Sequence, residues 1–193
     1  MAPSEYRTKL ETLVRKYRKN DVGAKYILNW DIFWEEKSHF VKLIDEGTIK
    51  SSLDIGTGIG MLPYLLQQKG IYVEGTEISE QMNDGLYTEC CDLIGLKRHV
   101  VEILPNQPMN LTRKYDLILA SRTIFDRQKG FDWSFFIDDC FKHCNTVLFK
   151  MNHVGRASVY PSKVRPFLFK NPQEHKVIRK SWFIKINKSE WVL

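Results

Sequence analysis

The apolar positions along the chain change their spacing several times, and each change marks the boundary of a predicted element. Residues 5–19 and about 31–46 carry apolar side chains at helical spacing. In the second stretch Asp31 suits the first turn of a helix and Gly47 provides a stop. We therefore predict that two helices open the chain.

From residue 51 onward, short apolar runs alternate with amphipathic segments, as strands and helices in turn would. Near-continuous apolar runs such as 116–120 and 146–151 favour strands that are covered on both faces. We therefore predict an α/β fold with a mostly parallel seven-stranded sheet, helices on both faces and an N-terminal helical cap. The expected strands are 51–56, 72–77, 99–104, 115–120, 146–151, 177–186 and 191–193, and the expected helices are 61–69, 79–87, 133–143 and a helix or lid near 161–169.

The length and composition limit the class of protein. A chain of 193 residues that is 43% hydrophobic can build the core of one domain, so we expect a single domain over residues 1–193. We divide it into a helical cap (1–46), a core (50–152), and a lid with closing strands (153–193). No window approaches the roughly 18 apolar residues that cross a bilayer. Since the first residues also lack the apolar core of a secretory signal, we expect no membrane partner.

The four cysteines point to a reducing compartment. Cys90 and Cys91 are adjacent, and Cys140 and Cys144 are four residues apart, which matches neither a disulfide framework nor a CxxC metal knuckle. Cys140, His143 and Cys144 offer three metal ligands without a visible fourth. We therefore predict a cytoplasmic protein with buried or incidental thiols and no metal.

Charge is distributed unevenly along the chain, whose net charge is +6. Residues 1–25 hold seven Lys/Arg against three acids, residues 26–155 hold thirteen against eighteen, and residues 156–193 hold nine against two. Basic ends around an acidic middle suit nucleic acid, an acidic small substrate or an anionic membrane surface. An ordinary solvated surface explains the same distribution, so the charge leaves these alternatives open.

A glycine-rich segment from Leu53 to Gly60 joins the first predicted strand of the sheet to its helix. Its spacing is GxGxG, because Met61 stands where a dinucleotide fingerprint has its third glycine. Asp54 precedes the loop and would repel a pyrophosphate, but it suits a ligand with an ammonium group. No GK[ST] follows, which excludes a P-loop. S-adenosylmethionine, with an ammonium group, a sulfonium and a neutral ribose, fits these residues.

A second acid ends the next predicted strand. Glu77 follows Asp54 by 23 residues, and its carboxylate can accept hydrogen bonds from the two ribose hydroxyls. The alternative is that Glu77 only caps a helix that begins near Ser79.

The segments LDIGTGIG, VEGTE and KYDLILA, in this order, resemble the class I S-adenosylmethionine-dependent methyltransferases over about residues 50–152. The LNWDIFWEEK segment before them and the FDW-FFIDD helix after them are similar to a group of small bacterial-type members. The resemblance implies a Rossmann-like sheet, a cofactor-binding core at 50–152, and S-adenosyl-L-methionine as cofactor. It implies no particular substrate.

The resemblance also assigns residues. Asp116 matches the acid of the fourth strand, and Glu102 and Ile103 are candidates for the adenine wall. Tyr26 and Trp30 are the expected lid residues, although the aromatic residues near Trp30, together with Lys37, can equally be core. The predicted cofactor-binding set is Trp30, Asp54, Gly56, Thr57, Gly58, Gly60, Glu77, Ile78, Glu102, Ile103 and Ala120.

Ligands of open α/β sheets lie beyond the carboxyl ends of the strands, so residues after the fourth and fifth strands should face the methyl acceptor. Thr123 and Asn152 belong to this group. His153 suits a base or only a hydrogen bond, and Arg122 suits an acidic substrate or neutralises Asp126. The predicted catalytic residues are Ser121, Arg122 and His153.

The expected activity is methyl transfer to nitrogen or oxygen of a small-molecule acceptor (EC 2.1.1.-). ASRTIF after the fourth strand lacks the [DN]PP[YF] tetrad, which disfavours methylation of exocyclic amino groups in DNA. The alternatives are an inactive cofactor-binding partner protein, a nucleotide-dependent oxidoreductase, or an RNA methyltransferase that uses Arg156, Lys163, Arg165 and Lys170 as a phosphate track.

Overall fold

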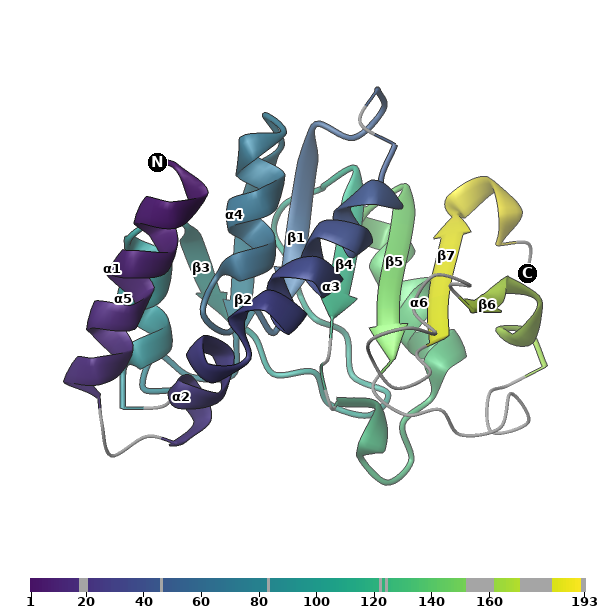
Figure 1. Cartoon of the computed structure of the whole chain (residues 1–193). Coiled ribbons are helices and arrows are strands. Elements are labelled where there is room, and N and C mark those ends of the chain that lie inside the picture. The colour runs from purple at the N-terminus through teal and green to yellow at the C-terminus, as the bar shows by residue number, and fades with distance from the viewer. Residues whose placement is uncertain are drawn as a thin grey trace.

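The computed structural model describes residues 1–17, 21–45, 47–82, 84–121, 123, 125–151, 162–170 and 182–191. Its strands are β1 (Ser51–Ile55), β2 (Tyr72–Glu77), β3 (Lys97–Val100), β4 (Leu117–Ser121), β5 (Thr146–Met151), β6 (Leu168–Lys170) and β7 (Trp182–Asn187). They form one seven-stranded sheet in the order β3-β2-β1-β4-β5-β7-β6 (Figure 1). β1 to β5 run parallel, and β7 is antiparallel to β5 and β6. The predicted α/β class with a mostly parallel sheet is confirmed.

The helices are α1 (Pro3–Lys16), α2 (Asp21–Leu28), α3 (Trp30–Lys42), α4 (Met61–Gln68), α5 (Leu86–Asp92) and α6 (Trp133–His143). Short 3₁₀ helices lie at Phe125–Arg127, Arg165–Phe167 and Lys188–Glu190. In Figure 1, α3 lies in front of the sheet and α6 lies behind it. No helix in the described ranges is long and apolar enough to cross a membrane.

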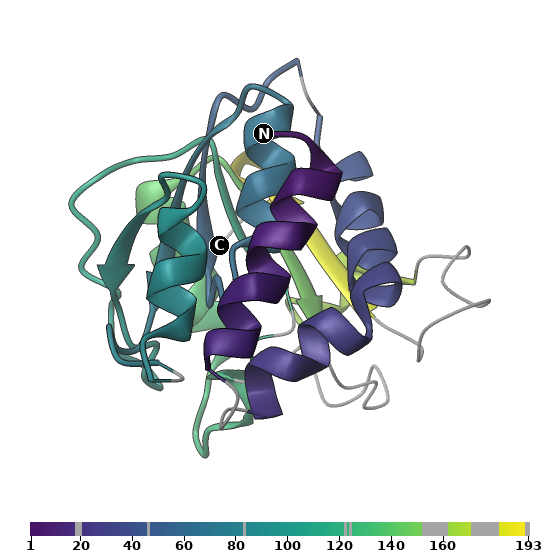
Figure 2. The same cartoon turned by 60° about the vertical axis from the view of Figure 1, so that its left-hand side comes forward.

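The central strands are buried on both faces because their apolar side chains alternate between two cores. In β4, Leu117 and Leu119 pack with α3 and α4, whereas Ile118 and Ala120 pack with α6. α1 adds an outer layer against α4 and α5 (Figure 2), with Tyr6 stacked on Tyr64 at 4.1 Å between ring centroids. This arrangement leaves the carboxyl ends of β1, β2, β4 and β5 together at one edge.

Two predicted elements beside that edge are displaced. The helix expected at 79–87 begins only at Leu86, because Asp84 and Gly85 adopt left-handed backbone angles that a continuous helix excludes. The strand expected at 99–104 spans Lys97–Val100, so residues 101–104 leave the sheet at its edge. The sequence pattern missed α2 altogether, since Gly23 interrupts its short apolar stretch.

The closing region also differs from the prediction. The helix or lid expected near 161–169 is a 3₁₀ turn followed by the edge strand β6. β7 (Trp182–Asn187) matches residues 182–186 of the strand expected at 177–186 and continues by one residue. Residues 177–181 lie outside the described residues. Of the strand expected at 191–193, only Trp191 lies within the described residues. It follows a 3₁₀ helix, its ring packs on Phe141 and Phe167, and its indole N–H donates to Asp138.

Candidate functional site

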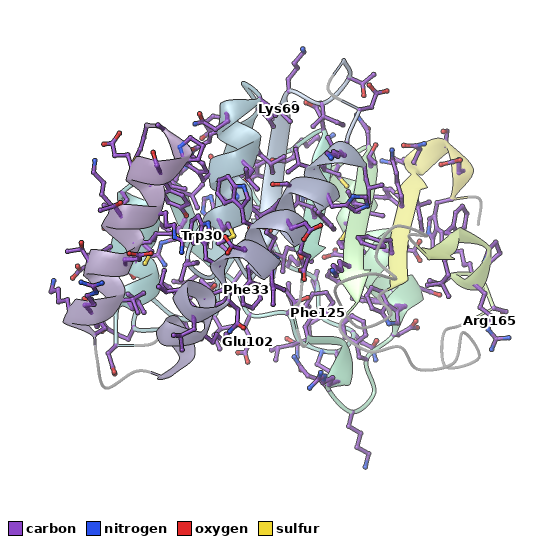
Figure 3. The ribbon with its side chains drawn as sticks, viewed as in Figure 1. Trp30, Phe33, Lys69, Glu102, Phe125 and Arg165 are labelled. Carbon is purple, nitrogen blue, oxygen red and sulfur yellow. The ribbon has the colours of Figure 1, made fainter. Side chains whose placement is uncertain are left out.

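A cleft of about 420 Å³ opens at the carboxyl edge of the sheet, within the usual size range of small-molecule sites. It extends from the glycine loop and the end of β2 to the segments that follow β3 and β4. Figure 3 shows Phe33, Glu102 and Phe125 near this edge, with Lys69 and Arg165 far from it. The cleft is lined by Lys25, Tyr26, Ile55, Gly56, Gly58, Thr76, Glu77, Ile78, Met82, Tyr87, Val101, Glu102, Ile103, Thr123, Phe125 and Gln128.

The glycine loop packs so closely against its surroundings that side chains would not fit at Gly56 in the loop or at Gly75 in the adjacent strand β2. Gly56 has a φ of 69°, and a Cβ there would lie 2.7 Å from Cγ2 of Thr123. A Cβ at Gly75 in β2 would lie 2.3 Å from Oγ1 of Thr57. The amides of Gly56 and Thr57 both donate to the carbonyl of Thr76, at 3.1 and 3.0 Å. The loop therefore presents bare backbone to the cleft.

Glu77 lies at the end of β2 and lines the cleft, although only 7% of its surface is exposed. Its Oε1 accepts a hydrogen bond from the Gly58 amide at 2.5 Å. Burial raises the pKa of the Glu77 carboxyl, while the hydrogen bond from Gly58 opposes the shift. The alternative that Glu77 caps a helix near Ser79 is wrong, because the next helix begins at Leu86.

Asp54 faces a second, inner pocket of about 30 Å³, which it shares with Phe33, Lys37 and Ser121. The Asp54 side chain is 3% exposed. Burial raises the pKa of Asp54 to about 7, Lys37 counteracts that rise, and the charge of Glu77 adds to it. A positively charged ligand group would stabilise the ionised form of this buried carboxyl.

Tyr26 connects the two cavities. Its ring lines both the cleft and the inner pocket, as does Gly56. The hydroxyl of Tyr26 lies 3.6 Å from where a Cβ on Gly58 would be. Tyr26, which α2 carries, therefore lies where the cleft and the inner pocket meet.

The structure brings most of the predicted cofactor-binding residues to these two cavities. Of this set, Gly56, Gly58, Glu77, Ile78, Glu102 and Ile103 line the cleft, and Asp54, Gly56 and Thr57 line the inner pocket. Gly60 lies at the start of α4, where a Cβ would contact Ile94 and Cys91. Ala120 is 1% exposed in the core on the α6 side, and neither Gly60 nor Ala120 lines the cleft or the inner pocket.

The structure places Trp30 away from both cavities. Its ring stacks on Trp34 at 5.2 Å, meets Tyr6 edge-on, and carries the Arg7 guanidinium over one face. These contacts hold it between α1 and α4, and Figure 3 shows it above Phe33. Phe33 and Lys37 of the same helix do line the inner pocket. The aromatic segment is therefore divided between core and site.

Asp116 serves the opposite end of the sheet. Its Oδ2 accepts hydrogen bonds from the amides of Lys50 and Ser51 at 2.9 and 2.8 Å, which ties the start of β4 to the start of β1. Burial would raise the pKa of Asp116, but these hydrogen bonds lower it overall. The residue has a structural role far from the cleft.

The predicted acceptor-facing residues are only partly described. Ser121 lies in the inner pocket, where its Oγ accepts a hydrogen bond from Lys37 Nζ at 2.6 Å. Thr123 lines the cleft. Arg122, Asn152 and His153 lie outside the described residues.

Sequence reasoning missed several residues of the cleft. Phe125 and Gln128 belong to the irregular segment after β4, and Gln128 Nε2 donates to the carbonyl of Ile103 at 2.7 Å. This bond joins two walls of the cleft. Their position after a strand of the parallel sheet was an available signal. Met82 and Tyr87, in contrast, enter the cleft because α5 starts later than predicted.

The four cysteines are free and buried. Cys91 lies beside the glycine loop, where its Sγ is 3.5 Å from the Gly58 carbonyl. Burial raises the pKa of the Cys90 thiol to about 12, and that of the Cys91 thiol rises further. In the part of the chain that the structure describes, no group of three His, Cys, Asp or Glu side chains could hold a metal ion.

The predicted phosphate track is only partly described. Lys163 Nζ lies 4.2 Å from the ring centroid of Trp191 and 3.8 Å from Asp138 Oδ1, and Arg165 is exposed. Arg156 and the side chain of Lys170 lie outside the described parts. Of the four cations, one is therefore visibly exposed.

The fold of this chain is similar to those of several solved proteins. No protein-family model and no curated protein matches the chain. The N-methyltransferase NodS from Bradyrhizobium japonicum WM9 has a TM-score of 0.57 and 12% identity, over 81% of this chain and 96% of that protein. Magnesium protoporphyrin IX methyltransferase (ChlM) from Synechocystis PCC 6803, solved with bound SAM, has a TM-score of 0.55 and 14% identity, over 86% and 83%. TrmK from M. capricolum, solved with S-adenosyl-homocysteine, has a TM-score of 0.53 and 15% identity, over 80% and 68%.

These likenesses, at such low identities, establish the architecture. The chain has the class I methyltransferase fold, in agreement with the resemblance of its glycine loop and strand ends.

Proposed function

We propose that this chain is an S-adenosyl-L-methionine-dependent methyltransferase that acts on nitrogen or oxygen of a small molecule. The observation that carries the proposal is the pair of buried acids, Asp54 and Glu77, at the ends of adjacent strands. Each acid faces one of two cavities, and bare glycine backbone lies between them.

The described residues fit the three parts of this cofactor. Glu77 has acceptor sites besides the one that Gly58 uses, so its carboxylate can bind the ribose hydroxyls. Ile78, Val101, Ile103 and Phe125 supply apolar walls for a base. Asp54 offers a negative charge to the ammonium group, in a pocket where burial makes such a pairing strong.

The bound cofactor supplies an electrophilic methyl group, and the chain's task is to align an acceptor with it. Ser121 and Thr123 border the cavities at the end of β4, where an acceptor would approach. The titratable lining residues among those described are acids, lysines and tyrosines, with no histidine. An amine that arrives uncharged needs no strong base, so these residues suit nitrogen at least as well as oxygen.

The comparisons support an enzyme more than an inert binder. NodS is an N-methyltransferase, and ChlM is a methyltransferase of magnesium protoporphyrin IX. The free, buried thiols suit a reducing compartment, and we propose the cytoplasm.

Transfer of labelled methyl groups from S-adenosyl-L-methionine into a fractionated cell extract tests the proposal. We expect label in the low-molecular-mass fraction with the wild-type chain and none with Glu77→Ala. Label in RNA would favour the nucleic-acid alternative. Binding of S-adenosylhomocysteine without any transfer would favour the inactive partner protein.

A further inference from the structure

The buried face of α3 contains two charged residues in a row, which an ordinary packing face would not have. Glu36 and Lys37 are 3% and 8% exposed, and they lie among the apolar residues Phe33, Phe40 and Val41. Burying a charge is costly unless another charge or a ligand compensates it. Their place on this face therefore requires a structural partner, a ligand, or both.

Glu36 has a structural partner in the sheet. Its Oε2 lies 3.2 Å from Nζ of Lys150 in β5, and the two side chains are among the most buried of the chain. Oε1 of Glu36 also lies 3.8 Å from Nζ of Lys37. The Glu36–Lys150 pair thus fixes α3 against the end of β5 and sets the position of the neighbouring lysine.

Lys37 directs its charge into the inner pocket. Its Nζ donates to Ser121 Oγ at 2.6 Å, and its charge lowers the pKa of Asp54 against the effect of burial. Both Lys37 and Asp54 line the pocket, so it presents one cation and one anion to the same small space. This arrangement is complementary to a zwitterion.

The charge balance explains which ligand such a pocket prefers. When Asp54 is ionised, the formal charges of Glu36, Lys37, Asp54 and Lys150 cancel. The other buried acid of the two cavities, Glu77, is assigned to the ribose. A ligand with both an ammonium group and a carboxylate adds no net charge to them, whereas a ligand with the ammonium group alone leaves one uncompensated positive charge in a buried site. This balance of charge favours the zwitterion over the amine.

We propose that Lys37 binds the α-carboxylate at the amino-acid end of the cofactor, and that the Glu36–Lys150 ion pair positions Lys37 for this. The inference rests on the proposed function, because it takes the cofactor as the ligand. It names a specificity determinant that comes from α3 rather than from the glycine loop.

Calorimetric titration with three ligands tests the proposal. S-adenosylhomocysteine has the carboxylate, its decarboxylated analogue S-adenosyl-3-thiopropylamine keeps only the amine, and 5′-methylthioadenosine has neither. For Lys37→Met we expect affinity for S-adenosylhomocysteine to fall roughly 10- to 100-fold relative to that for S-adenosyl-3-thiopropylamine, so that the preference for the carboxylate is lost, and affinity for 5′-methylthioadenosine to stay nearly unchanged. Lys37→Arg should restore part of the loss. Lys185→Met is the matched control, since Lys185 donates to the Leu43 carbonyl at the other end of α3.

The outcomes separate this inference from the proposed function. If wild type binds none of the three ligands, the proposed function fails and the inference fails with it. If wild type binds S-adenosylhomocysteine and Lys37→Met binds it equally well, or loses all three ligands equally, only the role of Lys37 is wrong.

A double variant, Glu36→Met with Lys150→Met, tests the positioning part, because apolar replacement of a buried ion pair often preserves the fold. We expect it to lose much of the preference for the carboxylate ligand, and full retention would contradict the positioning role. If the double variant does not fold, Glu36→Asp, which keeps the charge on a shorter side chain, gives the same readout.

Discussion

Replacing Glu77 by glutamine should separate ligand binding from stability. The substitution keeps the shape of the side chain and an oxygen that can accept from the Gly58 amide. It removes the negative charge from a group that is 7% exposed. Glu77 is the proposed partner of two ribose hydroxyls, so Glu77→Gln should weaken cofactor binding specifically.

The magnitude follows from the two hydrogen bonds at stake. A bond to a charged group contributes about 1.5–3 kcal/mol and a neutral one about 0.5–1.5 kcal/mol, so losing the charge costs about 1–1.5 kcal/mol for each hydroxyl. Two bonds give about 2–3 kcal/mol, or about 30- to 150-fold in affinity for S-adenosylhomocysteine.

The free energy of unfolding should not fall in parallel. Burial raises the pKa of Glu77, so the ionised carboxylate at neutral pH disfavours the folded state, and an uncharged glutamine removes that penalty. We expect the melting temperature without ligand to stay the same or rise. Calorimetric titration and thermal melts measure the two quantities separately.

Glu80→Gln is the matched control, because Glu80 follows the same strand end but is exposed, pairs with Arg98 and lines neither cavity. We expect it to change the affinity less than about threefold. Equal losses in both variants, or unchanged affinity in Glu77→Gln, would refute the ribose assignment.

The other predictions concern pH and the core. The pKa of Asp54 is about 7, and an ammonium group requires the ionised form of this residue. Affinity for S-adenosylhomocysteine should therefore fall by up to about tenfold per pH unit below pH 7 and be flat above pH 7. Titrations from pH 5.5 to 8.5 check this prediction, and a pH-independent affinity would contradict it. Trp30→Ala should destabilise the fold by about 3–5 kcal/mol in denaturant melts but leave the affinity of the folded fraction unchanged. Burial would raise the pKa of Glu74, but hydrogen bonds from Tyr115 and other donors hold it well below its usual range. Its ionised form therefore stabilises the fold above the unfolded pKa, and this stability is lost as pH falls, so Glu74→Gln should flatten the acid limb of a stability curve.

Strong local signals made part of the fold predictable. β2, β5 and α6 have the predicted bounds because apolar runs and turn residues delimit them directly in the sequence. α5 was displaced because left-handed angles at Asp84 and Gly85 interrupt a stretch whose composition is helical. α2 was missed because a short segment depends on tertiary packing for its stability.

Some residues of the candidate site could likewise be placed from the sequence, and others could not. Asp54 and Glu77 could be placed from the sequence, since parallel strands bring their carboxyl ends together. Trp30 and Lys37 lie on the same face of α3, about two turns apart. The packing of α1 over the first turn places the tryptophan in the core, whereas the lysine lines the inner pocket. Phe125 and Gln128 belong to an irregular segment, whose position depends on the whole fold.

A crystal structure of the chain with S-adenosylhomocysteine tests the central claim most directly. We predict the ribose hydroxyls within about 3 Å of the Glu77 carboxylate and the ligand's amine beside Asp54. A ligand bound elsewhere, or bound in the cleft with neither acid in contact, would contradict the account.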